Sequence, residues 1–265
     1  MKLDKNKYGK WALITGASSG IGKEYANEIA RAGFNVIAVA RNENNLNVLK
    51  NSLVTQFKVD VRVIAADLTS EEEINKVIET TEDLEVGLLV NNAGREDSNH
   101  FLKINPENHL QTVNLNVKAP LLLTHYFGSK MVERKRGGII NMSSIAAFQG
   151  IPYIANYAAT KSYNLVFSEG ISAEFEKHNV NVLAVAPGFT ATNLASVYDL
   201  KGTPFKPLDP AFVASTALKA LGKKRVVVPG GINKFLFWSG KFLFPRKLNT
   251  KSFGMVFKKV LRDTL

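Results

Sequence analysis

Short apolar runs alternate with helical segments along almost the whole chain. The runs are rich in β-branched residues and bounded by turn residues, at 11–16, 35–40, 61–67, 86–92, 138–141, 180–187 and 225–229. Strands that are apolar along their whole length are typical of a parallel sheet buried on both faces. Helical periodicity fills the intervals 21–32, 43–56, 70–81, 105–132, 152–177 and 210–221. This alternation predicts an α/β fold with a doubly wound parallel sheet of about seven strands and helices on both faces.

The composition is that of an ordinary globular protein, with 265 residues of which 45% are hydrophobic and 22% charged. We expect a single domain over residues 1–265, because no linker-like or repeated segment interrupts the alternation. The chain has no cysteine, which excludes disulfides and cysteine-ligated metal centres. Its four histidines are scattered without the spacing of metal ligands, so we predict no metal site.

The N-terminal residues are polar up to the first apolar run and lack the apolar core of a signal peptide. No uninterrupted apolar stretch approaches the roughly 20 residues of a membrane-spanning helix. These two observations predict a cytoplasmic protein.

A basic, aromatic segment, 232–265, ends the chain and contributes strongly to the net charge of +11. Its sequence repeats K-F-L-F at a seven-residue interval before Pro245, which predicts an apolar helix over about 232–244. This extension could pack on its own domain, on a second subunit or on a membrane surface, with its lysines toward anionic lipid. Nucleic acid is an unlikely partner because no recognition motif accompanies the charge.

The turn after the first apolar run, TGASSGIG, is rich in glycine. Glycines at this place permit positive φ angles and let a pyrophosphate approach the backbone at a helix N-terminus. Because the turn follows a strand and opens a helix, it favours dinucleotide binding over a purely structural turn. The predicted phosphate-end contacts are Gly16, Ser18, Ser19, Gly20, Ile21 and Gly22.

The end of the second run indicates which dinucleotide is bound. An acidic residue there commonly bonds the ribose 2′-hydroxyl of NAD, whereas this chain has neutral Ala40 followed by Arg41. A guanidinium can pair with a 2′-phosphate through two hydrogen bonds, so we predict NADP(H), although Arg41 could also merely solvate a loop. Asp67 closes the third run and is placed either to meet the adenine or to cap a helix.

Tyr157 and Lys161 lie four residues apart in NYAATK, within a predicted helix. That spacing puts a phenol and an ammonium on one helical face, one above the other. On spacing alone, a solvated helix face would be the common explanation. The preceding run ends in Ser143 and Ser144, at the sheet edge where open parallel sheets bind ligands.

The motifs together resemble the short-chain dehydrogenase/reductase family, whose fold is Rossmann-type. TGASSGIG, Asp67, NNAG, Asn114, Ser144, YAATK and PGFTAT occur in the family's order and spacing, over about Lys10 to Pro229. The resemblance implies that Tyr157 is the general acid in carbonyl reduction and that Lys161 lowers its pKa and holds the nicotinamide ribose.

Further roles follow from the same resemblance. Ser144 would hydrogen-bond the substrate oxygen, while Ser143 satisfies backbone near the strand end. Asn114, chosen over Asn116, would anchor a water in the proton relay. The remaining implied cofactor contacts are Asn92, Ala93, Gly94, Pro187, Gly188, Thr190 and Thr192.

The segment 191–208 contains Pro and Gly and covers the substrate in this family. Its apolar residues, with those before the predicted helix, suggest an apolar pocket: Leu194, Val197, Tyr198 and Phe205, with Phe148, Tyr153 and Ile154. We therefore predict an NADP(H)-dependent oxidoreductase that interconverts a ketone and a secondary alcohol, and expect a homodimer or homotetramer. The alternatives are a non-catalytic NADP-binding regulator and a protein that docks on a membrane or partner through its tail.

Overall fold

A computed structural model describes residues 3–203, 205–235 and 245–261. Its centre is a seven-stranded sheet in the order β3-β2-β1-β4-β5-β6-β7, in which every pairing is parallel. The strands are β1 (Trp11–Thr15), β2 (Asn35–Ala40), β3 (Val61–Ala65), β4 (Val86–Asn91), β5 (Gly137–Met142), β6 (Val180–Val185) and β7 (Val226–Val227). The order reverses between β1 and β4, which creates the switch point at which open sheets of this kind bind ligands.

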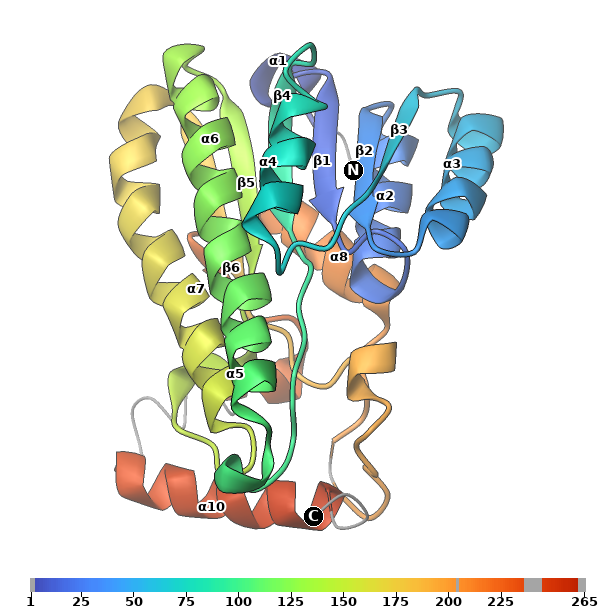
Figure 1. Cartoon of the computed structure of the whole chain (residues 1–265). Helices are drawn as coiled ribbons and strands as arrows, with labels where there is room; N and C mark the ends of the chain where they lie inside the picture. The colour runs from blue at the N-terminus through green and yellow to red at the C-terminus, as the bar shows by residue number, and fades with distance from the viewer. Residues whose placement is uncertain (1–2, 204, 236–244, 262–265) are drawn as a thin grey trace.

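Helices cover both faces of the sheet (Figure 1). One face packs against α2 (Gly20–Arg31), α3 (Glu43–Phe57) and α8 (Pro210–Ala220). The other packs against α4 (Glu71–Glu79), α6 (Ala119–Glu133) and α7 (Ala155–Phe175). Further helical elements include α1 (Lys5–Tyr8), η1 (Phe101–Lys103), α5 (Pro106–Val113), η2 (Asn114–Lys118), η3 (Ile145–Phe148), η4 (Glu176–His178), η5 (Asn193–Ala195) and α10 (Arg246–Val260). The doubly wound α/β fold predicted from the alternation is confirmed.

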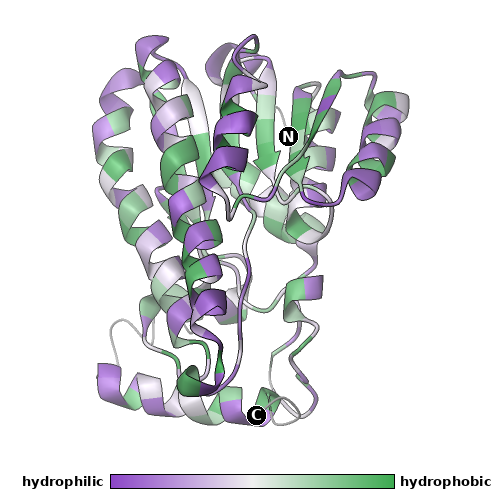
Figure 2. Cartoon of the chain, in the orientation of Figure 1, coloured by the Kyte–Doolittle hydropathy of each residue, from purple (hydrophilic) through white to green (hydrophobic). Residues whose placement is uncertain are grey.

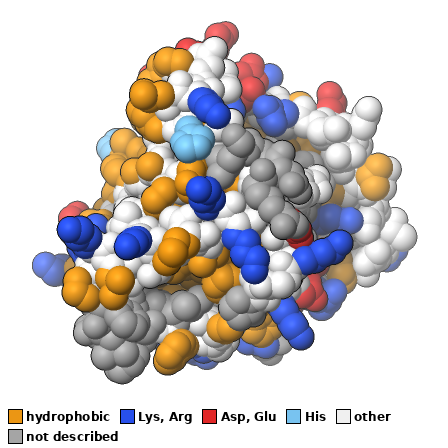
Figure 3. Space-filling model, turned by 90° about the horizontal axis from the view of Figure 1, so that it is seen from below, with side chains coloured by type: hydrophobic (Ala, Val, Ile, Leu, Met, Phe, Trp, Pro, Cys, Tyr) orange, Lys and Arg blue, Asp and Glu red, His pale blue; other side chains and the backbone are white. Residues whose placement is uncertain are grey.

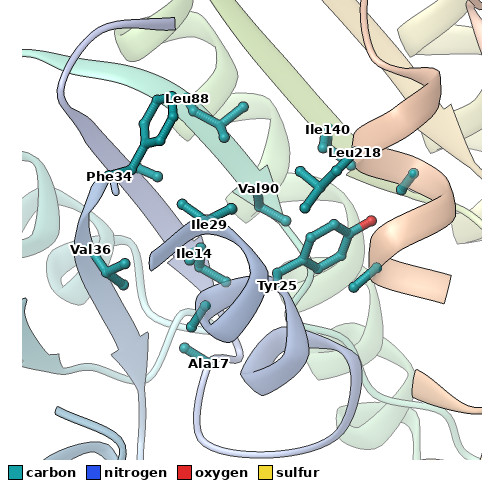
Figure 4. Close-up of a cluster of buried hydrophobic side chains, with 14 of the residues drawn as sticks. Ile14, Ala17, Tyr25, Ile29, Phe34, Val36, Leu88, Val90, Ile140 and Leu218 are labelled. Atoms are coloured by element: carbon teal, nitrogen blue, oxygen red, sulfur yellow. The ribbon is translucent and has the colours of Figure 1, made fainter. Parts of the chain in front are cut away.

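The core lies between the strands and the helices, as the hydropathy of the ribbon shows (Figure 2). Ile14, Leu88 and Val90 project from neighbouring strands onto Tyr25 and Ile29 of α2, all fully buried (Figure 4). The Tyr25 hydroxyl lies 3.4 Å from the sulfur of Met142, so even this buried polar group has a partner. Because both faces of each central strand are covered, both alternate positions are apolar, which explains the continuous runs in the sequence.

Three predicted boundaries differ from the structure. The interval 105–132 is divided by a π-helical turn, η2, between α5 and α6. The helix expected from 152 begins at Ala155, since Tyr153 has a φ of 71° that no helix accommodates. The last strand is only Val226–Val227, while most of the helix expected over 232–244 lies outside the described residues.

Helix α10, which belongs to the basic extension, crosses the end of the molecule beyond the carboxyl ends of the strands (Figure 1). Its residues Phe257 and Val260 are buried in a cluster with Ile151, Ile154 and Tyr157. Within the described ranges, no helix combines the length and the hydropathy needed to span a bilayer.

Candidate active site

The carboxyl ends of the strands open into a cavity of about 810 Å³. Most of the predicted site residues line it: Gly16, Ser18, Ser19, Gly20, Ile21, Arg41, Asp67, Asn92, Ala93, Gly94, Ser144, Tyr157, Lys161, Pro187, Gly188, Thr190 and Thr192. Gly22 and Asn114 are not part of this lining. The fold thus gathers into one space residues that are up to 176 positions apart in the sequence, from Gly16 to Thr192.

The glycine-rich turn after β1 is packed tightly against the end of β4. Gly16 has a φ of 67°, and a Cβ added to Gly22 would lie 2.5 Å from Nδ2 of Asn92. That amide donates to the Thr15 carbonyl at 3.0 Å, and the Thr15 hydroxyl accepts from the backbone N–H of Ala93 at 2.9 Å. The motif residues therefore fix the two strand ends to each other and leave the turn open to the cavity.

Arg41 and Asp67 lie at the ends of β2 and β3, where the cavity begins. Arg41 is exposed, which leaves its guanidinium accessible to an anion. Asp67 accepts hydrogen bonds from the backbone N–H of Thr69 at 3.0 Å and from its hydroxyl at 2.9 Å. The N-cap of α4 is Ser70, so Asp67 stabilises the turn before the helix and does not cap it.

Tyr157 and Lys161 project from the first turns of α7 and are both buried. The Lys161 Nζ lies 5.5 Å from the centroid of the Tyr157 ring and donates to the Met142 carbonyl at 3.0 Å. The Ser143 hydroxyl donates to the Lys161 carbonyl at 2.8 Å, which anchors α7 to the end of β5. The Ser144 hydroxyl accepts from the backbone N–H of Ala146 at 3.1 Å, and Ser144 and Tyr157 both line the cavity.

Asn116, not Asn114, connects the neighbouring helix to these residues. Its side chain is fully buried, accepts from the backbone N–H of Arg95 at 2.9 Å and donates to the Arg95 carbonyl at 2.9 Å. It also donates to the Thr160 hydroxyl at 3.0 Å, one residue before Lys161. Asn114 and Asn116 both lie in η2, and of these two it is Asn116, not our predicted Asn114, whose side chain contacts Arg95 and Thr160.

The far end of the cavity is aromatic. Phe189 lies 5.1 Å from Tyr198, 5.7 Å from Phe205 and 6.0 Å from Phe257, measured between ring centroids. Helix α10 closes this end with Phe253, Val256 and Phe257. Of the residues expected in an apolar pocket, Leu194, Tyr198, Phe205 and Ile154 line the cavity, whereas Val197, Phe148 and Tyr153 do not.

Residues 10–201 match the family model described as short chain dehydrogenase. The chain belongs to this family. It is 35% identical over 218 residues to the human very-long-chain 3-oxoacyl-CoA reductase, covering 81% of this chain and 69% of that protein. The family assignment made from the motifs, and with it the prediction of an oxidoreductase, is confirmed.

Solved structures resemble this short-chain dehydrogenase over most of its length. A 7β-hydroxysteroid dehydrogenase superposes with a TM-score of 0.88 at 28% identity, covering 96% of this chain and all of the other. A short-chain dehydrogenase from Sphingobium yanoikuyae, solved in complex with NADPH, has a TM-score of 0.77 at 30% identity and covers 87% of this chain and 92% of its own.

The electrostatics of the dehydrogenase site differ from our expectation. Burial and the nearby Glu96 raise the pKa of Tyr157, and this outweighs the lowering that its hydrogen bond to Ser144 produces. Burial also lowers the pKa of Lys161 to about 8, opposed by Glu96. Burial raises the pKa of Glu96 to about 7 against the opposing effects of its bond to Ser98 and of Lys161. Tyr157 is therefore firmly protonated before any ligand binds, as a proton donor must be.

Several residues of this site were missed by the sequence argument. Glu96, Phe189 and the α10 side chains line the cavity but belong to no motif that we used. The sequence did offer one signal for Glu96, because it lies only two positions after the NNAG motif. In the described part of the chain, no group of three or more His, Asp or Glu could hold a metal ion.

Proposed function

We propose that this short-chain dehydrogenase is an active, NADP(H)-dependent enzyme that interconverts a ketone and a secondary alcohol of a large apolar substrate. One observation carries the proposal: Tyr157, Lys161 and Ser144 line one cavity together with the glycine-rich turn and the aromatic side chains. A regulator that only sensed the dinucleotide would need no proton donor in that cavity. The intact set therefore favours catalysis over a purely regulatory role.

The residues present fit NADP(H). Gly16 and Gly20 have no side chain at the approach to α2, and Ser18 and Ser19 between them line the cavity. Helix N-termini favour phosphate through their free N–H groups. Arg41 offers a guanidinium at the end of β2, where a 2′-phosphate would be held. The similar enzyme solved with NADPH supports the same choice. Lys161, with its Nζ near Gly94, would hold the nicotinamide ribose.

The chain's own residues would handle the proton. When bound, NADPH supplies the hydride that reaches the carbonyl carbon. Ser144 would hold the carbonyl oxygen beside Tyr157, and the Tyr157 hydroxyl would transfer its proton to that oxygen, which completes the alcohol and leaves a phenolate. The Lys161 ammonium favours that phenolate, and the buried setting strengthens their attraction.

The substrate class follows from the aromatic end of the cavity. Phe189, Tyr198, Phe205 and Phe257 form a wall of rings that would exclude water from an apolar ligand. The names of the two reference proteins, a very-long-chain 3-oxoacyl-CoA reductase and a 7β-hydroxysteroid dehydrogenase, are consistent with a large apolar substrate.

The experiment is NADPH oxidation by the purified protein over a panel of ketones, from small to long-chain and polycyclic. We expect turnover with the larger ketones, and expect Tyr157→Phe to lower kcat by at least about 100-fold, the usual contribution of a general acid. The matched control is Tyr163→Phe, on the exposed side of the same helix, which should retain wild-type rates. Equal rates for wild type and Tyr157→Phe would show that Tyr157 is not the proton donor.

A second candidate function, docking on an anionic membrane surface, is favoured by the outer side of α10. The described helix carries Arg246, Lys247, Lys251, Lys258 and Lys259 and no acidic residue. Between them Leu248 and Met255 are exposed. Figure 3 shows Lys and Arg side chains interspersed with hydrophobic ones over this face. A basic face with apolar side chains is what an interfacial helix presents to anionic lipid, and here it would place the substrate cavity beside the bilayer.

Vesicle co-sedimentation tests this candidate. We expect the full chain to bind phosphatidylcholine vesicles that contain phosphatidylserine, and to be released by added salt. Lys251→Glu combined with Lys258→Glu should abolish binding. Lys219→Glu with Lys223→Glu makes the same charge change at exposed positions away from α10 and should bind as wild type does. Failure of the wild-type protein to bind at low salt would eliminate the membrane candidate.

A further inference from the structure

Glu96 is a carboxylate in the lining of a cavity that also contains the aromatic rings of Phe189, Tyr198 and Phe257. It lines the cavity two residues after Gly94, and a Cβ added to Gly94 would lie 3.4 Å from the Lys161 Nζ. Its charge also acts on both Lys161 and Tyr157. Glu96 therefore lines the same cavity as Tyr157, Lys161 and Ser144. Placing a carboxylate in such surroundings is costly unless it has partners.

The backbone beside Glu96 is held so that the side chain is directed to the cavity. Asn116 binds both the N–H and the carbonyl of Arg95, which fixes that residue from two sides. The Arg95 guanidinium donates hydrogen bonds to Gln111 and Asp97 and not to Glu96. Asp97 is also occupied, because it accepts from the Thr112 hydroxyl at 2.7 Å. Neither neighbour of Glu96 in the sequence competes for its carboxylate.

The carboxylate itself has few protein partners. Ser98 donates to its Oε1 at 2.7 Å, and the Ser98 hydroxyl lies 3.3 Å from that of Tyr198. Because Ser98 has one proton and gives it to Glu96, Tyr198 is the donor in the second bond. Among the ion pairs within 4.0 Å in the described ranges, none joins Glu96 to Lys161. Glu96 thus retains acceptor capacity within this cavity.

We propose that Glu96 is a specificity-determining residue that accepts a hydrogen bond from a hydroxyl group of the substrate, on a carbon close to the carbonyl that is reduced. This assignment rests on the proposed function. A hydroxyl fits better than an ammonium, since the Lys161 charge would repel a second cation and the apolar wall makes a charged group costly to desolvate. A substrate without the hydroxyl would leave the carboxylate without its partner, and sites of this kind reject such analogues.

A matched substrate pair tests the assignment. Deoxybenzoin (1,2-diphenylethanone) and benzoin differ by one hydroxyl on the carbon next to the carbonyl, and each benzoin enantiomer is assayed separately with NADPH. The quantity compared is the ratio of kcat/KM for benzoin to kcat/KM for deoxybenzoin in each protein, which removes the intrinsic reactivity of the two carbonyls. For the favoured enantiomer, we expect Glu96→Met to lower this ratio by at least about tenfold.

The two values of kcat/KM, for benzoin and for deoxybenzoin, should change in opposite directions. Glu96→Met is expected to lower kcat/KM for benzoin and to raise it for deoxybenzoin, which no longer leaves a carboxylate unpaired. Glu96→Gln retains an acceptor oxygen and should fall between wild type and Glu96→Met. Glu169→Met, at an exposed position of α7, is the control and should keep the wild-type ratio.

Two results would overturn the assignment and are distinguishable. If wild type and Glu96→Met give the same ratio of kcat/KM for benzoin to kcat/KM for deoxybenzoin, Glu96 does not bind the substrate hydroxyl. The proposed function would still stand. If the wild-type protein oxidises NADPH with no ketone of the wider panel, the proposed function fails and this assignment fails with it.

Discussion

Among single residues, Glu96 links the stability of the fold to pH. An unfolded glutamate has a pKa of about 4.3, whereas in the fold burial raises the pKa of Glu96 to about 7. The fold therefore favours the neutral form, and its stabilisation is present below about pH 4.3 and is lost as the pH rises through about 7. We expect the free energy of unfolding of wild type to fall relative to Glu96→Gln by about 3–4 kcal/mol over this window, because each pKa unit corresponds to about 1.4 kcal/mol.

Urea unfolding of both proteins without cofactor, at pH values below, within and above this window, measures the difference. Glu169→Gln, at an exposed position, serves as the control for changing a surface glutamate. A stability difference between wild type and Glu96→Gln that is the same at every pH would contradict the argument.

The residues of the site differ in how far sequence could predict them. Tyr157 and Lys161 could be found because one helical turn fixes their relation. The choice between Asn114 and Asn116 could not be made in that way, since a π turn shifts the side-chain directions by one residue against a regular helix. Glu96 was missed because its importance comes from burial and from charges on α7, neither of which its own segment encodes.

Among the elements, α10 completes the aromatic end of the cavity. Phe257 is 6% exposed and contacts the rings of Phe189 and Tyr198. We expect Phe257→Ala to lower the free energy of unfolding by about 3 kcal/mol and to raise KM for large ketones more than for small ones. Met255→Ala, on the exposed side of the same helix, should change stability by less than about 0.5 kcal/mol.

Thermal or urea unfolding, together with the ketone panel, measures both effects of Phe257→Ala. An unchanged ratio of KM values between large and small ketones would show that α10 does not shape the substrate end.

The strands and the α10 helix show what sequence patterns determine and what they leave open. Continuous apolar runs predicted the strands closely, because a central parallel strand is buried on both faces. The chain beyond Pro229 has no such repeat of strand and helix. The helix predicted there, over about 232–244, lies mostly outside the described residues, and α10 was not predicted as a helix. The sequence also left open whether the extension would pack on a partner, a bilayer or its own domain. In the structure Gly254 makes the contact close, as a Cβ there would lie 2.9 Å from Pro152.

At the scale of the whole molecule, the outer surface of α5, α6 and α7 leaves apolar side chains uncovered. α5 and α6 follow one another through η2, and α7 runs beside them (Figure 1). Leu110 of α5 is 57% exposed and Val166 of α7 is 66% exposed, with Leu121 of α6 exposed as well. Apolar groups spread over adjoining helices are typical of an interface, and a two-fold axis would bury the same surface on both subunits. We therefore propose that the expected homo-oligomer forms through this surface.

Val166→Glu tests the interface, because a two-fold contact would bring two carboxylates near one axis and bury them at a cost. We expect light scattering after gel filtration to give a dimer or tetramer for wild type and a smaller species for Val166→Glu, with unchanged circular dichroism. Val48→Glu is the matched control, since Val48 is 68% exposed on α3, which covers the opposite face of the sheet. A monomeric wild type would show that these apolar side chains do not hold two copies together, and an oligomer that persists in Val166→Glu would place the contact elsewhere.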